Sequence, residues 1–368
     1  MACVTTLFEP LTLRDLTVPN RIWLAPMCQY AVDREDGVPT DWHLVHLGAR
    51  AQGGFGLLLT EATAVAPEGR ISPQDTGLWN DTQRDAWGRI VDFVHSQDAA
   101  IGVQLAHAGR KASTYRGFDG EPQGSVPPAA GGWSTVGPSP ESFPSYAPPA
   151  ELTVDEIAEL VTAFVTATRR ADEAGFDVVE IHAAHGYLLH QFLSPLSNHR
   201  TDGYGGDFAG RTRLLLEVVD AVRAAWPVTK PLFVRISATD WVEGGWDGAQ
   251  SVRLSGLLAE RGVDLVDTST GGNVLADIPV GPGYQVPFAR EIRDAAGIRT
   301  GAVGLILEPQ QAEKILADGD ADVVLLARAA LREPAWPLRA AAELGLSWRE
   351  APYPPAYSRG RWDDVPAL

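Results

Sequence analysis

The chain has 368 residues, 45% hydrophobic and 21% charged, so it can bury a large core and belongs to the ordinary globular class. A formal net charge of −17 argues against nucleic acid and anionic membranes as partners, because both require a basic surface. The only cysteines, Cys3 and Cys28, exclude a disulfide framework, a cysteine-ligated iron–sulfur cluster and a structural zinc site built from cysteines. We see neither a signal peptide nor an apolar run of membrane-spanning length, so we expect a soluble, cytoplasmic protein.

Short runs rich in Val, Ile and Leu, bounded by Gly or Pro, predict eight buried strands. In chain order these are Arg21–Met27, Phe55–Ala62, Ala100–Ala106, Phe176–Ala183, Pro231–Ser237, Val263–Thr270, Ile298–Gly304 and Ala321–Arg328. A helical pattern follows each strand, and the clearest begins at a capping box of Thr153 and Glu156 and stops at Gly175. Eight such alternating units, joined by right-handed crossovers and closed on themselves, predict an α/β fold, the TIM (β/α)8 barrel.

Three segments exceed the plain barrel. The N-terminal "LTLRDLTVPN" is typical of a hairpin that plugs the bottom of the barrel. A Pro/Gly-rich excursion runs from about His107 to Ala150, between the third strand and its helix, and a loop of this length is usually functional or disordered. We therefore expect a single domain over residues 1–368, with the barrel core at about 21–345 and a C-terminal interface tail at about 346–368.

Polar residues gather where the predicted strands end. In a TIM barrel the active site lies at the C-terminal ends of the strands, so these positions are candidates for function. They are Pro26, Met27, Cys28, Gln29 and Tyr30; Glu61 and Thr63 around Ala62; Gln104 and His107; His182, His185 and Tyr187; Arg235; Gly301–Gly304; and Arg328.

Each group also has a simpler interpretation. His182 and His185 fit a zinc pair, although a catalytic zinc needs a third ligand and the spacing is loose, so this alternative stays open. Arg235 lies in a predicted barrel strand, where an unpaired guanidinium is costly and normally faces an anion. The glycine turn after the seventh strand and Arg328 after the eighth fit the phosphate site common in this fold. Together they indicate a phosphorylated cofactor with a redox-active or acid–base ring.

Several stretches resemble the Old Yellow Enzyme family of FMN-dependent ene-reductases, closest to its bacterial xenobiotic-reductase, or thermophilic-like, branch. They are "LFEPLTLRDLTVPNRIWLAPMCQY", "VQLAHAGRKAS", "EIHAAHGYLLHQFLSPLSNHRTDGYGGDFAGRTRLLLEVV", "TGAVG" and the terminal "YSRGRW". The resemblance covers essentially the whole chain and is most specific between Glu180 and Arg213. It implies a TIM barrel that holds one non-covalent FMN at its C-terminal face and is reduced by NADPH or NADH.

The resemblance also implies roles for single residues around the cofactor. The flavin would be lined by Ala25, Pro26, Met27 and Cys28, with Ala62 and Gln104 at the ring, Arg235 at its N1/O2 edge, and the phosphate on Gly301, Ala302, Val303, Ala327 and Arg328. Cys28, the marker of this branch, would tune the flavin potential. Ala327 departs from the Gly-Arg pair usual in the family, which implies a tighter phosphate site.

On the substrate side, the likeness implies an activated alkene reduced by a ping-pong mechanism. His182 and His185 would hold the carbonyl or nitro oxygen, Tyr30 would add a hydroxyl contact, and Tyr187 would deliver a proton to Cα after hydride reaches Cβ. Members of this branch insert an arginine from a neighbouring subunit's tail, which implies a homodimer or homotetramer. Arg359 matches that position better than Arg361, and no metal is implied.

Three rival hypotheses are set against this one. A dienoyl-CoA reductase or amine dehydrogenase would have a related barrel but would carry a four-cysteine iron–sulfur cluster and further nucleotide-binding domains, which this chain lacks. A metal-dependent hydrolase or aldolase would use His182 and His185 as ligands. A flavin-binding carrier or sensor would bind the cofactor without turnover of its own.

Overall fold

A computed structural model describes residues 5–362 and contains the predicted barrel; Cys3 lies outside this range. Eight parallel strands form a closed barrel in the order β10-β11-β12-β3-β4-β5-β8-β9. Their bounds are β3 Ile22–Leu24, β4 Leu57–Ala64, β5 Ala100–Ala106, β8 Val178–Ala183, β9 Leu232–Ser237, β10 Leu265–Ser269, β11 Arg299–Ala302 and β12 Val323–Leu326. All eight predicted strands are therefore confirmed, and the fold is a TIM barrel.

Four predicted strands, the first, sixth, seventh and eighth, are too long at the end that faces the site, and the first and the last show the reason. The first stops at Leu24 and not at Met27, because Pro26 has no N–H to donate to a ladder. The last stops at Leu326, and Arg328 is the first residue of helix α9, Arg328–Arg332. In both places the chain leaves the sheet at the C-terminal face, where the site is expected.

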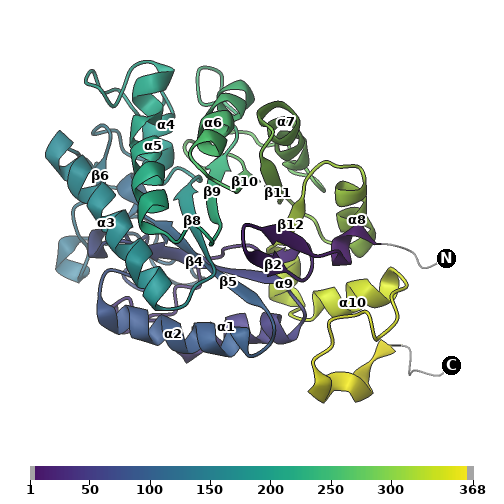
Figure 1. The fold of residues 1–368 in the computed structure, drawn as a ribbon. Coiled ribbons are helices and arrows are strands. Elements are labelled where there is room, and N and C mark those ends of the chain that lie inside the picture. The colour runs from purple at the N-terminus through teal and green to yellow at the C-terminus, as the bar shows by residue number, and fades with distance from the viewer. Residues whose placement is uncertain (1–4, 363–368) are drawn as a thin grey trace.

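Ten helices lie in the described part of the chain, and most of them form the outer layer of the barrel (Figure 1). Besides α9 they are α1 Asp41–Gln52, α2 Asp81–His95, α3 Val154–Glu173, α4 Leu188–Leu193, α5 Phe208–Ala225, α6 Gly248–Glu260, α7 Val286–Ala296, α8 Pro309–Ala317 and α10 Trp336–Glu343. The predicted capping box is present, since Thr153 N donates to Glu156 Oε2 at 2.8 Å and Glu156 N donates to Thr153 Oγ1 at 3.2 Å. Within residues 5–362, none of the helices is both long and apolar enough to cross a membrane.

The bottom of the barrel is closed by the predicted hairpin. Strands β1, Leu11–Leu13, and β2, Leu16–Val18, pair antiparallel. Leu13 and Val18 are fully buried and pack in one cluster with Trp23 and Phe233, whose rings stack with centroids 5.6 Å apart. These apolar residues close the barrel at this end, so its interior opens only at the C-terminal face.

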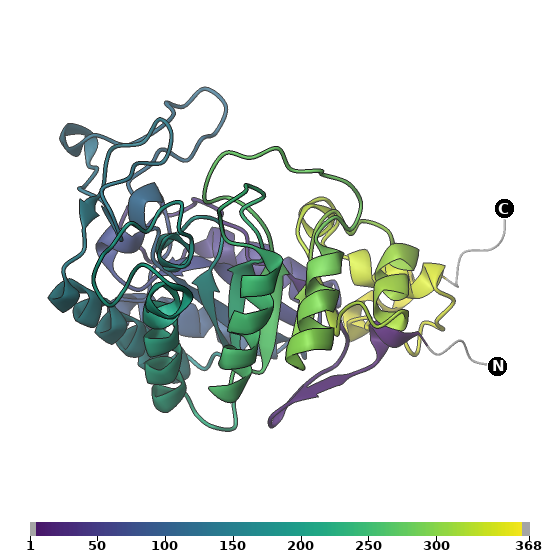
Figure 2. The ribbon, with the colours of Figure 1, turned by 90° about the horizontal axis from the view of Figure 1, so that it is seen from above.

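That other face carries the long connections (Figure 2). The excursion between β5 and α3 contains the 3₁₀ turns η3, Gly109–Lys111, and η4, Pro128–Ala130, and a short ladder of β6, Val136–Gly137, with β7, Ala150–Glu151. It is tied to the connection after β10, because Arg110 donates to the Asn273 carbonyl at 2.6 Å and Lys111 Nζ donates to the Gly272 carbonyl at 2.7 Å. The excursion is thus an ordered part of the rim, on the side opposite the hairpin.

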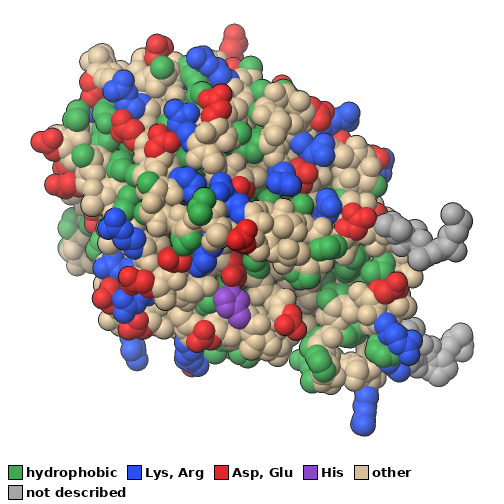
Figure 3. All heavy atoms as spheres, viewed as in Figure 1, with side chains coloured by type: hydrophobic (Ala, Val, Ile, Leu, Met, Phe, Trp, Pro, Cys, Tyr) green, Lys and Arg blue, Asp and Glu red, His purple; other side chains and the backbone are tan. Residues whose placement is uncertain are grey.

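The tail packs against the bottom end of the barrel, where Pro352 lies beside Gly54 in the segment that enters β4. After α10 it forms the 3₁₀ turn η5, Pro355–Gly360, and the Arg361 guanidinium stacks 3.8 Å from the Trp348 ring centroid. Both ends of the described chain lie on the same side of the molecule (Figure 1). Acidic and basic side chains are intermixed on the face seen in Figure 3, so the net negative charge is not gathered in one patch there.

Candidate active site

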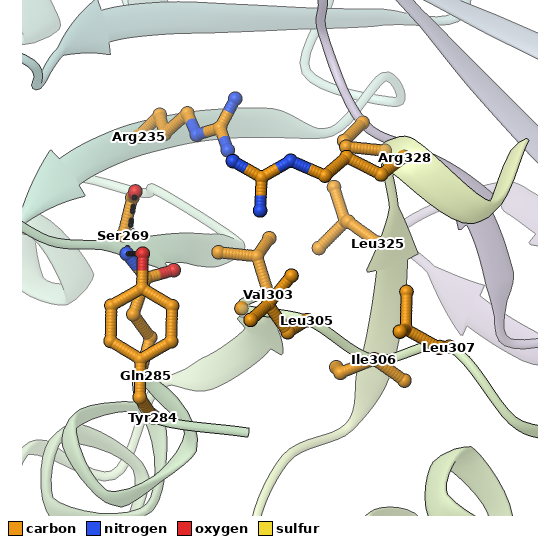
Figure 4. Close-up of a pocket in the computed structure, with 13 residues that line it drawn as sticks. Arg235, Ser269, Tyr284, Gln285, Val303, Leu305, Ile306, Leu307, Leu325 and Arg328 are labelled. Carbon is orange, nitrogen blue, oxygen red and sulfur yellow. Dashed lines mark hydrogen bonds between the residues drawn. The ribbon is translucent and has the colours of Figure 1, made fainter. Parts of the chain in front are cut away.

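An open cavity of about 190 Å³ lies at the C-terminal face, between β3 and the strands β9 to β12 (Figure 4). It is lined by Ala25, Arg235, Ser269, Tyr284, Gln285, Val303, Gly304, Leu305, Ile306, Leu307, Leu325, Ala327 and Arg328. The guanidinium groups of Arg235 and Arg328 point toward one another across it. Two cations that share one cavity favour an anionic ligand.

The barrel strand β9 places Arg235 inside the barrel, where the anion that it faces is a side chain of the protein itself. Its Nε lies 2.9 Å from Asp267 Oδ2 of the neighbouring strand β10, and Asp267 is fully buried. The two residues are register partners, so strand pairing itself brings them together. Arg235 is thereby held by a fixed counter-ion at Nε, and its Nη1 donates to the Pro26 carbonyl at 3.5 Å.

The segment after β11 provides backbone donors rather than side chains. Gly301 and Ala302 lie within the strand and do not line the cavity; a Cβ on Gly301 would meet Leu325 Cδ1 at 2.4 Å, so packing explains that glycine. Val303 is the first residue of this segment to line the cavity. In the described chain, the N–H groups of Gly304, Leu305 and Ile306 have no protein acceptor, which is the condition for an anion cradle.

Both predicted histidines stand beside this cavity. His182 is buried at the end of β8, next to its register partner Arg235, and its Nδ1 has no hydrogen-bond partner in the described chain. The His182 ring centroid lies 5.2 Å from that of His185 and 5.2 Å from that of Tyr187. The three polar rings that the sequence brings together at the strand exit therefore form one cluster.

His185 is fixed by its surroundings in a backbone conformation that non-glycine residues rarely adopt. Its φ is +59°, its N–H donates to Ser237 Oγ at 2.9 Å, and its Nε2 lies 2.7 Å from Ser269 Oγ. Such strain of about 1 to 3 kcal/mol persists only where neighbouring groups impose it, and it is concentrated at functional sites. Ser269 also lines the cavity, so it joins the histidine cluster to the anion site.

The electrostatic environment keeps these groups uncharged. Burial, reinforced by Arg235, lowers the pKa of both His182 and His185 well below the usual histidine value. Burial likewise raises the pKa of the Tyr187 phenol, with Cys28 and Asp75 adding to the effect. At neutral pH the cluster therefore presents two neutral imidazoles and a protonated phenol.

The loop after β3 forms the opposite wall. Cys28 and Tyr30 pack with Tyr187 on a floor of small residues that includes Ala62. The Cys28 thiol and the Tyr30 hydroxyl are hydrogen-bonded, and burial raises the pKa of the thiol, so it stays protonated. The register of β4 against β5 shifts between Leu59 and Ala62. Because of this shift, Ala62 lies at this position and pairs with Gln104 of β5. Pro26 and Met27 are half-buried in the same loop.

Gln104 belongs to the interior of the barrel rather than to the rim. It is buried, and its Nε2 donates to Glu180 Oε1 at 2.7 Å.

Tyr30 has a positive φ of 52°, so it is a second residue with a strained backbone beside the cluster of His182, His185 and Tyr187.

The tail does not complete the site within one chain. Arg359 is exposed on η5 and does not line the cavity, whereas Arg361 is engaged with Trp348. Between residues 5 and 362, no group of three or more His, Cys, Asp or Glu side chains is placed to hold a metal ion.

Sequence analysis missed several residues of the site. Ser269 and Asp267 are not among the predicted site residues, although their alternation in "VDTS" at the end of the sixth strand is typical of residues that face the barrel interior. Lys111, whose Nζ donates to the His185 carbonyl at 2.9 Å, and Gln285, which donates to Thr270 Oγ1 at 2.9 Å, sit in loops where no periodic signal exists.

Comparisons with known proteins agree with this geometry. A family model described as the NADH:flavin oxidoreductase / NADH oxidase family matches residues 6–347. The chain is 49% identical over 344 residues to an NADPH dehydrogenase of Geobacillus sp. (strain WCH70), covering 93% of this chain and 96% of that relative. Among solved structures, an old yellow enzyme homologue from Zymomonas mobilis matches with a TM-score of 0.78 and 29% identity, over 99% of this chain and 100% of that one. Morphinone reductase in complex with tetrahydroNAD matches with a TM-score of 0.76 and 30% identity, over 93% and 92% of the two chains.

The cavity offers two arginines and unpaired backbone N–H groups, which can bind a phosphate. Beside it lie two neutral histidines, which can donate hydrogen bonds without carrying charge. This combination fits a flavin nucleotide. The chain belongs to the NADH:flavin oxidoreductase / NADH oxidase family and is an FMN-dependent NADPH oxidoreductase of the Old Yellow Enzyme type.

Proposed function

We propose that the protein is an ene-reductase, which reduces the C=C bond of activated alkenes such as α,β-unsaturated ketones, aldehydes, imides and nitro compounds. The observation that carries this proposal is the cluster of two neutral imidazoles and a protonated phenol directly beside a cation-lined cavity. That arrangement offers two hydrogen-bond donors to one oxygen and a proton to a neighbouring carbon.

FMN would be held non-covalently. Arg328 and the free N–H groups of Gly304–Ile306 would bind the phosphate, and Arg235 would face the ring where negative charge accumulates. Ala25, Cys28, Ala62 and Gln104 would complete the ring site, with Pro26 and Met27 in the same wall. When bound, FMN supplies the hydride that NADPH or NADH has delivered to it.

The substrate oxygen would accept hydrogen bonds from His182 and His185. Because both imidazoles are neutral, they act as dipolar donors that stabilise the enolate-like charge as hydride reaches Cβ. Tyr187 would donate its proton to Cα, and its raised pKa ensures that the phenol is protonated at neutral pH. Tyr30 would add a contact from the opposite wall. In a ping-pong cycle, the oxidised nicotinamide leaves before the alkene enters the same place.

We also propose that the site is completed by Arg359 of a second copy in a homodimer or homotetramer. Its exposed position on η5 leaves it available to a neighbour, whereas Arg361 already stacks on Trp348 within its own chain.

An anaerobic titration tests the proposed function. The purified protein with its flavin is bleached by NADPH, and cyclohexenone is then added while the flavin absorbance is followed. An ene-reductase recovers the oxidised spectrum with one cyclohexenone consumed per flavin. Flavin that NADPH reduces but that no activated alkene reoxidises would instead favour a carrier or sensor.

A further inference from the structure

The barrel interior beneath the cavity contains two carboxyl groups and one guanidinium. Glu180 and Asp267 are both fully buried, and Arg235 lies between the strands that carry them. Full ionisation of both carboxyls would leave one uncompensated negative charge in a closed, water-poor space, which costs several kcal/mol. The interior therefore favours a state in which one of the two carboxyls keeps its proton.

The contacts identify which carboxyl that is. Asp267 Oδ2 lies 2.9 Å from Arg235 Nε, so its charge has a partner. Glu180 Oε1 accepts a hydrogen bond from the neutral amide of Gln104 at 2.7 Å, and its Oε2 has no hydrogen-bond partner in the described chain. A carboxyl with one oxygen bonded to a neutral donor and the other free is the one expected to be protonated.

Among residues 5–362, Asp267 and Arg235 are the charged groups that act on Glu180. Along β8, the next inward residue is His182, which is held neutral by burial and by Arg235. The inward residues of the strands across the barrel are apolar, among them Trp23 on β3, Leu59 on β4 and Leu325 on β12. Burial and the charge of Asp267 raise the pKa of Glu180, while Arg235 opposes them.

We propose that Glu180 is the proton-holding residue of this site: it carries a proton while Asp267 is ionised against Arg235, and its proton occupancy follows the negative charge in the cavity above. Glu180 touches Gln104 and not the substrate, so it is a positioning residue for the electrostatics of the ring site. A hydride from NADPH would bring two electrons and one proton to bound FMN, so one negative charge would remain in the cavity. An ionised fraction of Glu180 would then take up a proton, with one O–H bond formed on its carboxyl and one O–H bond of a solvent hydronium broken.

The first measurement requires no bound flavin. Infrared difference spectra of the purified protein between about pH 6 and pH 10 detect the C=O stretch of a protonated carboxyl, in a range where fully buried Glu residues titrate. The buried Asp75, whose pKa is also raised by burial, contributes equally to all the proteins and cancels when a variant's spectrum is subtracted from that of the wild type. We expect the wild-type spectrum minus that of Glu180→Gln to contain a band at neutral pH, and the same band to be lost in Asp267→Asn, where Arg235 is freed to pair with Glu180. Asp240→Asn is the matched control, because Asp240 is fully buried but paired with His190 at 3.1 Å, which with other hydrogen bonds lowers its pKa. Identical bands in the wild type and in Glu180→Gln would overturn the assignment.

The second measurement rests on the proposed FMN function. The midpoint potential of the bound flavin is measured against pH for the wild type, Glu180→Gln and Asp240→Asn. We expect the wild type and Asp240→Asn to gain one extra proton per two electrons within the titration range, which steepens the line by about 30 mV per pH unit. Equal slopes in the wild type and Glu180→Gln would refute the coupling. Failure to bind FMN would refute the proposed function, while the infrared band would still decide the location of the proton.

Discussion

Replacing His182 by alanine is the most selective test of the hydrogen bonds that we propose between the two histidines and the substrate oxygen. His182 is only 3% exposed, and its Nδ1 has no partner among the described residues, so no hydrogen bond of that nitrogen is lost within the fold. A phenol bound as its anion resembles the enolate that forms during reduction, and a hydrogen bond to a charged group contributes about 1.5 to 3 kcal/mol. We therefore expect His182→Ala to raise the dissociation constant of phenol by about 10- to 150-fold.

The assay is a titration of the flavin absorbance with phenol, performed on protein with equal FMN content and equal thermal stability. His182→Asn serves as a partial rescue, because its amide retains an N–H donor, and substitution of the exposed His199 by alanine serves as a surface control. A phenol affinity that changes less than twofold in His182→Ala would show that this imidazole does not bind the oxygen.

Three further predictions follow from the same contacts. Tyr187→Phe should bind FMN and be reduced by NADPH at the wild-type rate but reoxidise with cyclohexenone at least about tenfold more slowly, as stopped-flow absorbance would show; an unchanged oxidative step removes Tyr187 as proton donor. Ser269→Ala, which removes the partner 2.7 Å from His185 Nε2, should weaken phenol binding by about 0.5 to 1.5 kcal/mol, whereas the control Ser255→Ala on α6 should not; equal effects would mean that Ser269 does not orient His185. Burial lowers the pKa of His107 from 6.5 to about 4. As the pH falls, the unfolded chain therefore binds a proton at His107 before the folded protein does. The free energy of unfolding should fall by about 3 kcal/mol as the pH drops from 6.5 to 4. Urea unfolding at each pH should show a smaller loss in His107→Asn, and an identical loss in both proteins would contradict this origin of acid sensitivity.

The barrel itself could be predicted from the sequence, because fully buried parallel strands appear as short apolar runs that need no knowledge of their neighbours. Ala100–Ala106 coincides with β5, and the hairpin at the bottom was expected from its turn and alternation. The predicted strand ends failed where a proline or a helix start intervenes, at Pro26 and at Arg328. The missing N–H of Pro26 and the start of α9 at Arg328 end these strands, and neither effect is visible in the apolar pattern.

The partners within the site could not be predicted, since they depend on strand register and on loop contacts between distant residues. Arg235 was recognised as a buried cation, but its counter-ion Asp267 emerges only from the pairing of β9 with β10. The backbone donors after β11 begin at Gly304, the last residue of the glycine turn, and extend two residues beyond it to Ile306. Lys111 joins the excursion to the backbone of His185, a contact across 74 positions of sequence for which no local signal exists.

A crystal structure of the FMN-loaded protein with bound phenol tests the central claim most directly. We expect the flavin ring over Arg235, the phosphate at Arg328 and Gly304–Ile306, and the phenol oxygen within hydrogen-bond distance of a ring nitrogen of both His182 and His185. A phenol oxygen that contacts neither imidazole, or a phosphate bound away from the two arginines, would contradict the account.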